Sequence, residues 1–156
     1  KSTTSILTTP KKSSRKTITI SKESKTLLDN WIKELGLEFF LQTKGRSLFD
    51  DMFRNGVLLS EVLAKEMPSE SIKLKLVKYS PRNIDDCRRN LKLCMDIVRE
   101  KFGTNLNSEL FFAEEKLLEG DYDILYGIIQ TIKDLIIDTI GAVFVWYIVS
   151  RNKIRK

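Results

Sequence analysis

Residues 47–63 read SLFDDMFRNGVLLSEVL and place the turn dipeptide Asn55-Gly56 inside a run of apolar residues at helical spacing. Three apolar residues before the dipeptide fall on one face of a short helix that begins at Ser47: Phe49, Met52 and Phe53. The apolar residues after it form a second helix: Val57, Leu58, Leu59, Val62, Leu63 and Met67. Because Gly and Asn tolerate a positive φ, the chain can change direction at the dipeptide and resume as a helix on a new axis. We therefore predict two helices packed beside each other, with Leu59 and Leu63 pointing inward.

Two further helices are marked by start and stop signals. The first follows Ser21 or Ser24 as its N-cap and ends at Gly36, with an apolar stripe of Leu27, Leu28, Trp31, Ile32 and Leu35. The clearest helix runs from Ser80 as N-cap and Pro81 in the first turn to Gly103, with Asp85 and Asp86 near its positive end. Its predicted core stripe is Ile84, Cys87, Leu91, Cys94, Met95 and Val98.

The remaining segments complete an all-α pattern. We expect an irregular, Lys-bearing loop over 68–80, a short helix over 107–120 capped by Asn107 or Ser108, and a long final helix from residue 121 onwards. The last helix is apolar almost all round, which is typical of a helix that is central or covered by something. The sequence thus predicts a bundle of about four main helices plus two or three short ones, with a core around Trp31, Leu59, Leu91 and Leu125.

The positive charge of the chain is concentrated at its beginning. The formal net charge is +6, and residues 1–25 hold seven of the 27 basic side chains but only one of the 21 acidic ones. The rest of the chain is therefore neutral on balance. We interpret residues 1–20 as a basic, Ser/Thr-rich arm, in which Lys11, Lys12, Arg15 and Lys16 face a polyanionic partner such as an acidic polymer, nucleic acid or membrane. A solvated linker is the alternative.

The apolar run DTIGAVFVWYIVS, residues 138–150, raises the question of a membrane anchor. Its uncharged part is Thr139–Ser150, which is shorter than the ~20 apolar residues that a bilayer span needs. The basic sequence RNKIRK follows it, as after many membrane anchors. We favour a helix covered by a partner, extending over residues 137–156, and keep the anchor as the alternative.

The chain lacks histidine and the common motifs of catalytic and phosphate-binding sites. It has no His, no Gly-rich phosphate loop and no nucleophile motif. DYDILYG at 121–127 begins like a calcium loop, but Leu125 and Tyr126 occupy the positions where that loop has an oxygen ligand and Gly. The acidic residues at 109–123 are interpreted as a solvated face. Cys87 and Cys94 lie on one helix with their Cα atoms roughly 10 Å apart, too far for a disulfide, so we expect reduced, buried thiols. We expect a binding module without catalytic activity, cofactor or metal.

Four segments in this order resemble a calponin homology domain. LLDNWI (27–32) is similar to the first family helix, LFDDMFRNGVLLSEVL (48–63) to its short helix, turn and Leu-rich helix, NIDDCRRNLKLCMDIV (83–98) to its central helix, and LLEGDYDILYGIIQTI (117–132) to its closing helix. The resemblance covers roughly residues 24–136, so we divide the chain into the arm at 1–20, a calponin-homology-like domain at 21–136 and the extended helix at 137–156.

The resemblance implies binding to the cytoskeleton. Tandem calponin homology domains bind F-actin, whereas single divergent ones bind microtubules or act as scaffolds in cilia. One copy with basic extensions favours the acidic surface of tubulin in the cytoplasm, for example inside an axoneme, with F-actin or a signalling scaffold as the alternative. Nucleic acid is disfavoured by the neutral body. The expected contacts are the arm cations named above, a loop cluster and a helix pair: Lys73, Lys75, Lys78, Arg82, Arg88 and Arg89. Other subunits are expected to contact the arm and the C-terminal helix.

Overall fold

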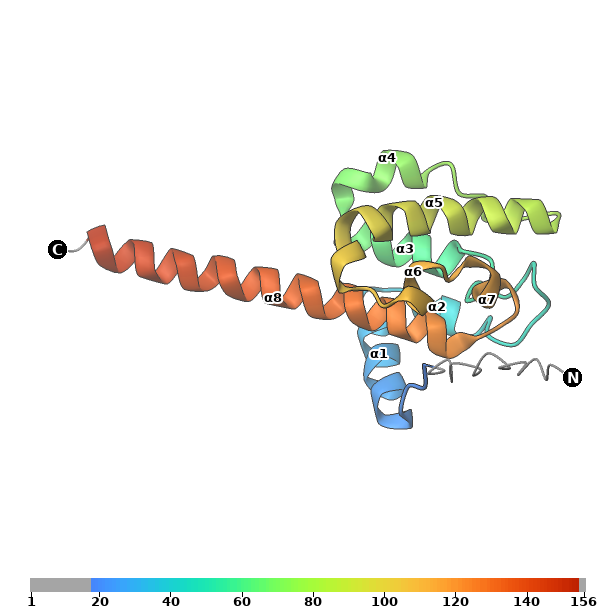
Figure 1. The fold of residues 1–156 in the computed structure, drawn as a ribbon, viewed down its shortest axis with the longest axis horizontal. Coiled ribbons are helices and arrows are strands. Elements are labelled where there is room, and N and C mark those ends of the chain that lie inside the picture. Colours follow the sequence, from blue (N-terminus) through green and yellow to red (C-terminus); the bar gives the residue numbers. More distant parts are fainter. Residues whose placement is uncertain (1–17, 155–156) are drawn as a thin grey trace, which may run out of the picture.

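The computed structural model describes residues 18–154, and all the regular structure in this part of the chain is helical. The expected all-α class is therefore confirmed. The four longest helices are α1 (Lys22–Glu34), α3 (Val57–Glu66), α5 (Ile84–Phe102) and α8 (Tyr122–Ile154) (Figure 1).

Short helical segments join the four long helices and are more numerous than expected. They are α2 (Glu38–Leu41), η1 (Pro68–Glu70), α4 (Ser71–Leu74), η2 (Gly103–Asn105), α6 (Ser108–Phe111) and α7 (Glu114–Leu118). The prediction of an irregular loop over 68–80 was wrong in its first half, where η1 and α4 form. The single short helix expected over 107–120 is two helices, because the chain leaves helical geometry at Phe112 (φ −115°, ψ 54°).

The segment before Asn55 does not form the predicted short helix but a series of turns. The reason is that side chains bind the backbone N–H groups that a helix would use. The buried Asp51 carboxylate accepts from the N–H groups of Gly45 and Phe53, both at 3.0 Å. The Thr43 hydroxyl accepts from the N–H of Met52 at 3.1 Å.

The dipeptide Asn55-Gly56 lies where α3 begins and touches α5. Gly56 has φ 87°, and a Cβ atom there would lie 2.9 Å from the Cβ of Asn90. Asn55 keeps a negative φ, and its side-chain oxygen accepts from the N–H of Val57 at 3.1 Å. The buried Asn90 amide donates to the carbonyl oxygens of Asn55 and Lys78. The turn therefore serves a close helix contact as well as a change of direction.

The start of α5 differs from the prediction. Its N-cap is Asn83, whose side-chain oxygen accepts from the N–H of Asp86 at 2.8 Å, so Ser80 and Pro81 lie outside the helix. The Asp86 carboxylate accepts from the N–H of Arg82, the residue before the N-cap, at 3.1 Å. Together these two hydrogen bonds explain why Asn83 rather than Ser80 begins the helix. Ile84 is 43% exposed, contrary to the prediction, whereas the rest of the predicted stripe is buried.

The core follows the sequence pattern in most places. Leu59, Leu91 and Leu125 are buried, while Trp31, on α1, is only partly buried and packs against the core as a whole. The buried residues of α1 are Leu28 and Ile32, whose helix is capped by Ser21. Leu27 is 62% exposed, so its assignment to the core stripe was wrong.

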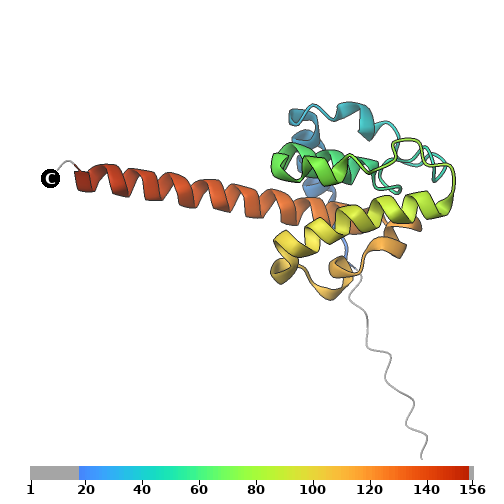
Figure 2. The same cartoon turned by 90° about the horizontal axis from the view of Figure 1, so that it is seen from above.

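Helix α8 runs through the body and continues well beyond it (Figures 1 and 2). Its inner segment, residues 124–132, is almost wholly buried and packs against α1, α3 and α5. The large apolar side chains of α8 are exposed from Ile137 to Val149, and we call residues 137–154 the outer segment. At the other end of the chain, Ile18 and Ile20 pack against the core, so the last residues of the expected arm lie on the body.

Candidate partner-binding surface

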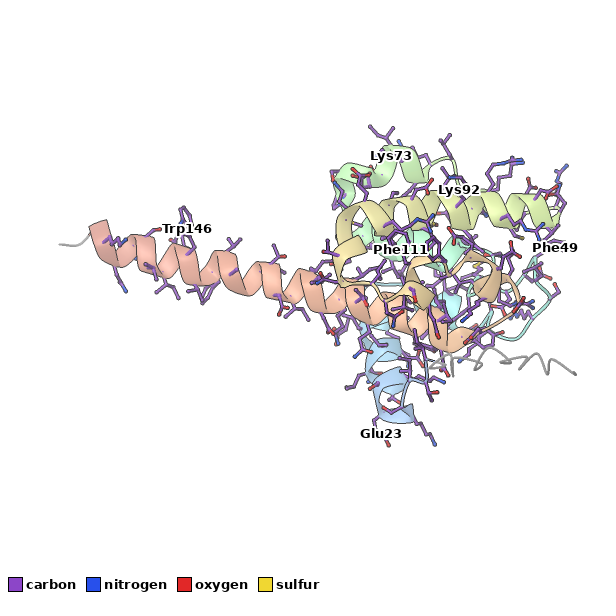
Figure 3. The ribbon with its side chains drawn as sticks, in the orientation of Figure 1. Glu23, Phe49, Lys73, Lys92, Phe111 and Trp146 are labelled. Carbon is purple, nitrogen blue, oxygen red and sulfur yellow. The ribbon has the colours of Figure 1, made fainter. Side chains whose placement is uncertain are left out.

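The predicted contact cations fall into three groups: four in the arm, five along one edge of the body, and Arg88 by itself. The four arm cations, Lys11, Lys12, Arg15 and Lys16, lie outside the described residues. Five of the others line one edge of the body, formed by α4, the loop after it and the start of α5: Lys73, Lys75, Lys78, Arg82 and Arg89. We call these five residues the basic edge. Figure 3 shows Lys73 standing outward from α4 above α5.

One end of the basic edge is built over a buried carboxylate, Glu70. Its two oxygens lie 3.2 Å from the Nζ of Lys73 and 3.4 Å from the Nζ of Lys101, which α5 supplies. The hydrogen bond from Lys73 is the main reason that the pKa of Glu70 lies below its ordinary value, with Lys101 adding to it. Both lysines are more exposed than the carboxylate that holds them.

The other end of the basic edge repeats this arrangement at Asp86, in the first turn of α5. The Asp86 carboxylate lies 2.9 Å from the Nζ of Lys78 and 3.7 Å from a guanidinium nitrogen of Arg89. The hydrogen bond from Lys78, followed by that from the N–H of Arg82, lowers the pKa of Asp86. Glu70 and Asp86 are 7% and 5% exposed, so each end presents two cations over a buried acid. At the Glu70 end, the exposed carboxylate of Glu100 also lies 3.8 Å from the Nζ of Lys73.

Lys75 and Arg82 complete the basic edge without an acidic neighbour. Both are exposed, and no described carboxylate lies within 4 Å of either side chain. Their charges are therefore available to a partner without the loss of an ion pair in the body.

The helix pair Arg88 and Arg89 does not act as a unit. Successive helix residues point about 100° apart, and Arg88 is turned towards α7, where its Nε donates to Glu115 at 3.0 Å. This hydrogen bond lowers the pKa of Glu115. Arg88 thus joins α5 to α7 and lies apart from the basic edge, although it stays half-exposed.

The outer segment of α8 is the second exposed feature. Its large apolar side chains are 42–70% exposed, and Trp146 stands in open space far from the body (Figure 3). Six residues surround a shallow hollow on one side of it: Thr139, Ile140, Val143, Phe144, Trp146 and Tyr147. No helix within residues 18–154 combines the length and the hydropathy needed to cross a bilayer.

Groups suited to metal binding do not converge in the described part of the chain. Within residues 18–154, no three side chains of His, Cys, Asp or Glu are grouped closely enough to hold a metal ion. Cys87 and Cys94 are buried and reduced, and burial raises the pKa of both thiols. Four of the six acidic residues at 109–123 are partners of basic side chains: Glu109 with Lys116, Glu114 with Arg99, Glu115 with Arg88 and Asp123 with Lys25.

The sequence prediction missed the two buried acids that organise the basic edge. The spacings Glu70-x-x-Lys73 and Asp86-x-x-Arg89 are ion-pair spacings on a helix and could have indicated them. Their burial has no such signal, because it depends on how α4 and the loop after it lie against α5. Lys101 was missed for the same reason.

Comparisons with known proteins add no relative. No protein-family model matches the chain, no curated protein matches it, and no solved structure matches the fold.

Proposed function

We propose that the chain is a non-catalytic module that binds an acidic cytoskeletal filament, the microtubule, through the basic edge. The observation that carries this proposal is the layering of charge at that edge, where buried carboxylates hold exposed cations. A surface of this kind presents positive charge at fixed positions, whereas mixed surface charges largely cancel. Fixed positive charge matches an acidic filament by electrostatic complementarity.

The finer expectation of a calponin-homology-like domain is part of the same proposal. It is supported by the order of the four long helices and by the Asn55-Gly56 turn that joins α3 to the body. The basic arm, which precedes α1, would add a second cationic contact to the filament. F-actin remains the alternative filament, and other subunits of a cytoskeletal or ciliary assembly remain candidates for contact with the arm.

Co-sedimentation with stabilised microtubules tests the proposal. Lys75→Gln with Arg82→Gln removes two charges of the basic edge that no described acid pairs, so we expect the dissociation constant to rise about fivefold at low salt. The matched control is Lys22→Gln with Lys33→Gln, which removes the same charge from α1. Helix α1 lies on the opposite side of the body from α4 (Figure 1), and both lysines are exposed, so this control should bind like the wild type.

Salt and filament type complete the experiment. Binding should weaken as salt rises, because exposed charges are screened over about 8 Å at physiological ionic strength. No pelleting at low salt, or equal weakening by the two double variants, would refute binding through the basic edge. Pelleting with F-actin and not with microtubules would establish the alternative filament.

A further inference from the structure

The outer segment of α8 is apolar on every side. A helix with one solvated face would carry polar residues on that face. Phe144, Val145, Trp146 and Tyr147 are each 55–70% exposed. Because successive residues are about 100° apart, these four point around the whole circumference. A helix of this kind is normally enclosed, so the outer segment requires neighbours on more than one side.

The two ends of this apolar stretch carry opposite charge. Asp134 and Asp138 lie at the end nearest the body, where the partly buried Lys133 precedes them, and Arg151 and Lys153 lie at the far end. These two acids and the two far-end cations are exposed, and no described side chain of opposite charge lies within 4 Å of any of them. Asp134 and Asp138 are also four residues apart, a spacing at which like charges destabilise a helix. Asp134 and Asp138 therefore have no ion-pair partner among the described residues. Basic residues like those at the far end of the segment would provide such a partner.

The shape of the molecule limits how two such helices can pair. In both views, α8 leaves the body from its middle, with other helices on either side of the α8 axis (Figures 1 and 2). Packed helices lie about 8–10 Å apart, so two copies paired in parallel and in register would drive their bodies into each other. Antiparallel copies keep their bodies at opposite ends of the paired segments.

We propose that the outer segments of two copies of this chain pack antiparallel, with the uncharged stretch Thr139–Ser150 of one copy alongside that of the other. This register places the acidic end of each segment beside the basic end of its partner. It also brings Val143 and Trp146, which line the shallow hollow, close to the two-fold axis, where a side chain of the partner can fill that hollow. Two such pairs would together cover every side of the helices, as in a four-helix bundle.

The same features argue against a lipid bilayer as the occupant. The uncharged stretch has 12 residues, which span about 18 Å as a helix against about 30 Å of hydrocarbon. A helix lying flat on a membrane would need one polar face, and the outer segment has none between Asp138 and Arg151.

Molar mass of the full chain, measured by light scattering over a dilution series, is the first test. The wild type should behave as a dimer or as a pair of dimers. Val143→Asp should be a monomer, with the same helix content in the body, because this side chain is exposed and lies outside the core. A wild type that is monomeric at all concentrations would overturn the proposal.

Charge reversal at the two ends tests the antiparallel arrangement. The acid-end variant carries Asp134→Lys and Asp138→Lys, and the basic-end variant carries Arg151→Glu and Lys153→Glu. Each variant alone brings like charges together at both ends of an antiparallel pair, so its dimer dissociation constant should rise at least about tenfold. A mixture of the two variants, and one chain that carries all four changes, should both recover the wild-type constant.

Parallel pairing gives a different result, because acidic ends then face acidic ends in the wild type and like ends still face each other in each variant. Unchanged association of both single-end variants would therefore overturn the antiparallel arrangement.

The lipid alternative is tested by flotation with vesicles of phosphatidylcholine and phosphatidylserine. Flotation of the wild type that is lost in Val143→Asp, together with a monomeric wild type in solution, would assign the outer segment to lipid. None of these readouts involves filaments, so the result is independent of the proposed function.

Discussion

The inner and outer segments of α8 are alike in composition and opposite in surroundings. Residues 124–132 are rich in Ile and almost wholly buried in the body, whereas residues 137–149 are equally apolar and exposed. One continuous helix thus serves two purposes, and apolar composition alone does not distinguish them. The inner segment should determine the stability of the body, and the outer segment should determine what the body is attached to.

The largest expected effect is the difference in unfolding free energy between two Ile→Ala substitutions, one in each segment of α8. Ile128→Ala removes a fully buried side chain and should lower the free energy of unfolding by about 2–5 kcal/mol. Ile140→Ala, at an exposed position, should change it by less than about 0.5 kcal/mol when both variants are compared in the monomeric Val143→Asp background. The chain has two Trp residues, and Trp31 reports on the body in a Trp146→Phe background, so urea unfolding followed by fluorescence measures both values. Equal losses would show that the segments form one cooperative unit.

The contact at Gly56 supports the inner segment indirectly, since α8 packs on both α3 and α5. Gly56→Ala should destabilise the body by roughly 1–3 kcal/mol from the positive φ alone. The new Cβ, 2.9 Å from that of Asn90, should add to this loss because the two helices must move apart. Thermal unfolding measures the effect, with Gly45→Ala as the control: Gly45 also has a positive φ but nothing lies within 4 Å of its added Cβ. A loss no larger than that of the control would show that the close contact is dispensable.

Two tyrosines provide a smaller contrast. The hydroxyl of Tyr126, in the inner segment, donates to Asp29 at 2.7 Å, so Tyr126→Phe should cost about 1 kcal/mol at pH 7. Tyr147→Phe, in the outer segment, should leave the stability of the body unchanged. Burial, followed by the hydrogen bond to Asp29, raises the pKa of Tyr126 above its ordinary value of 10.0.

The raised pKa gives this contrast a pH dependence with a definite sign. The unfolded chain releases the Tyr126 proton near pH 10 while the folded chain still holds it, so this contribution to stability is complete below pH 10 and declines as the pH rises from there. The difference in melting temperature between the wild type and Tyr126→Phe should therefore shrink in alkaline buffer. A constant difference between pH 7 and pH 11 would contradict the assignment.

The smallest expected effects come from two glycines of α8. Gly141→Ala meets nothing within 4 Å and should stabilise the helix by up to about 1 kcal/mol. Gly127→Ala gains the same helix propensity, but its Cβ would lie 3.1 Å from Leu110, so the gain should be smaller or lost. Hydrogen exchange of each segment in the monomeric Val143→Asp background measures both. A larger gain at Gly127 than at Gly141 would mean that Leu110 yields readily.

The periodic pattern predicted the long helices well, because apolar spacing and terminal residues are local properties. It failed where two local signals compete: Ser80 and Asn83 are both good N-caps, and the bonds between Asn83, Asp86 and Arg82 decide between them. It also failed at Leu27, which lies beside the true stripe of Leu28 and Ile32, since the width of the buried face depends on the neighbouring helices.

The candidate surface was less predictable than the fold. The cations of the basic edge could be named from the sequence, but their division into pairs over Glu70 and Asp86 depends on contacts between distant segments. The direction of Arg88 away from Arg89 could have been inferred from helix geometry alone. The exposure of residues 137–149 could not, because the pattern of a covered helix and that of an uncovered one are the same.

The two buried thiols allow opening of the helical body to be measured by thiol modification. The sulfur of Cys94 lies 3.5 Å from the carbonyl oxygen of Gly56, at the contact between α3 and α5. A small disulfide reagent reaches it only when these helices separate, so the rate of thiol modification measures how often the body opens. The same burial leaves an engineered surface cysteine as the single fast-reacting site for attaching a probe.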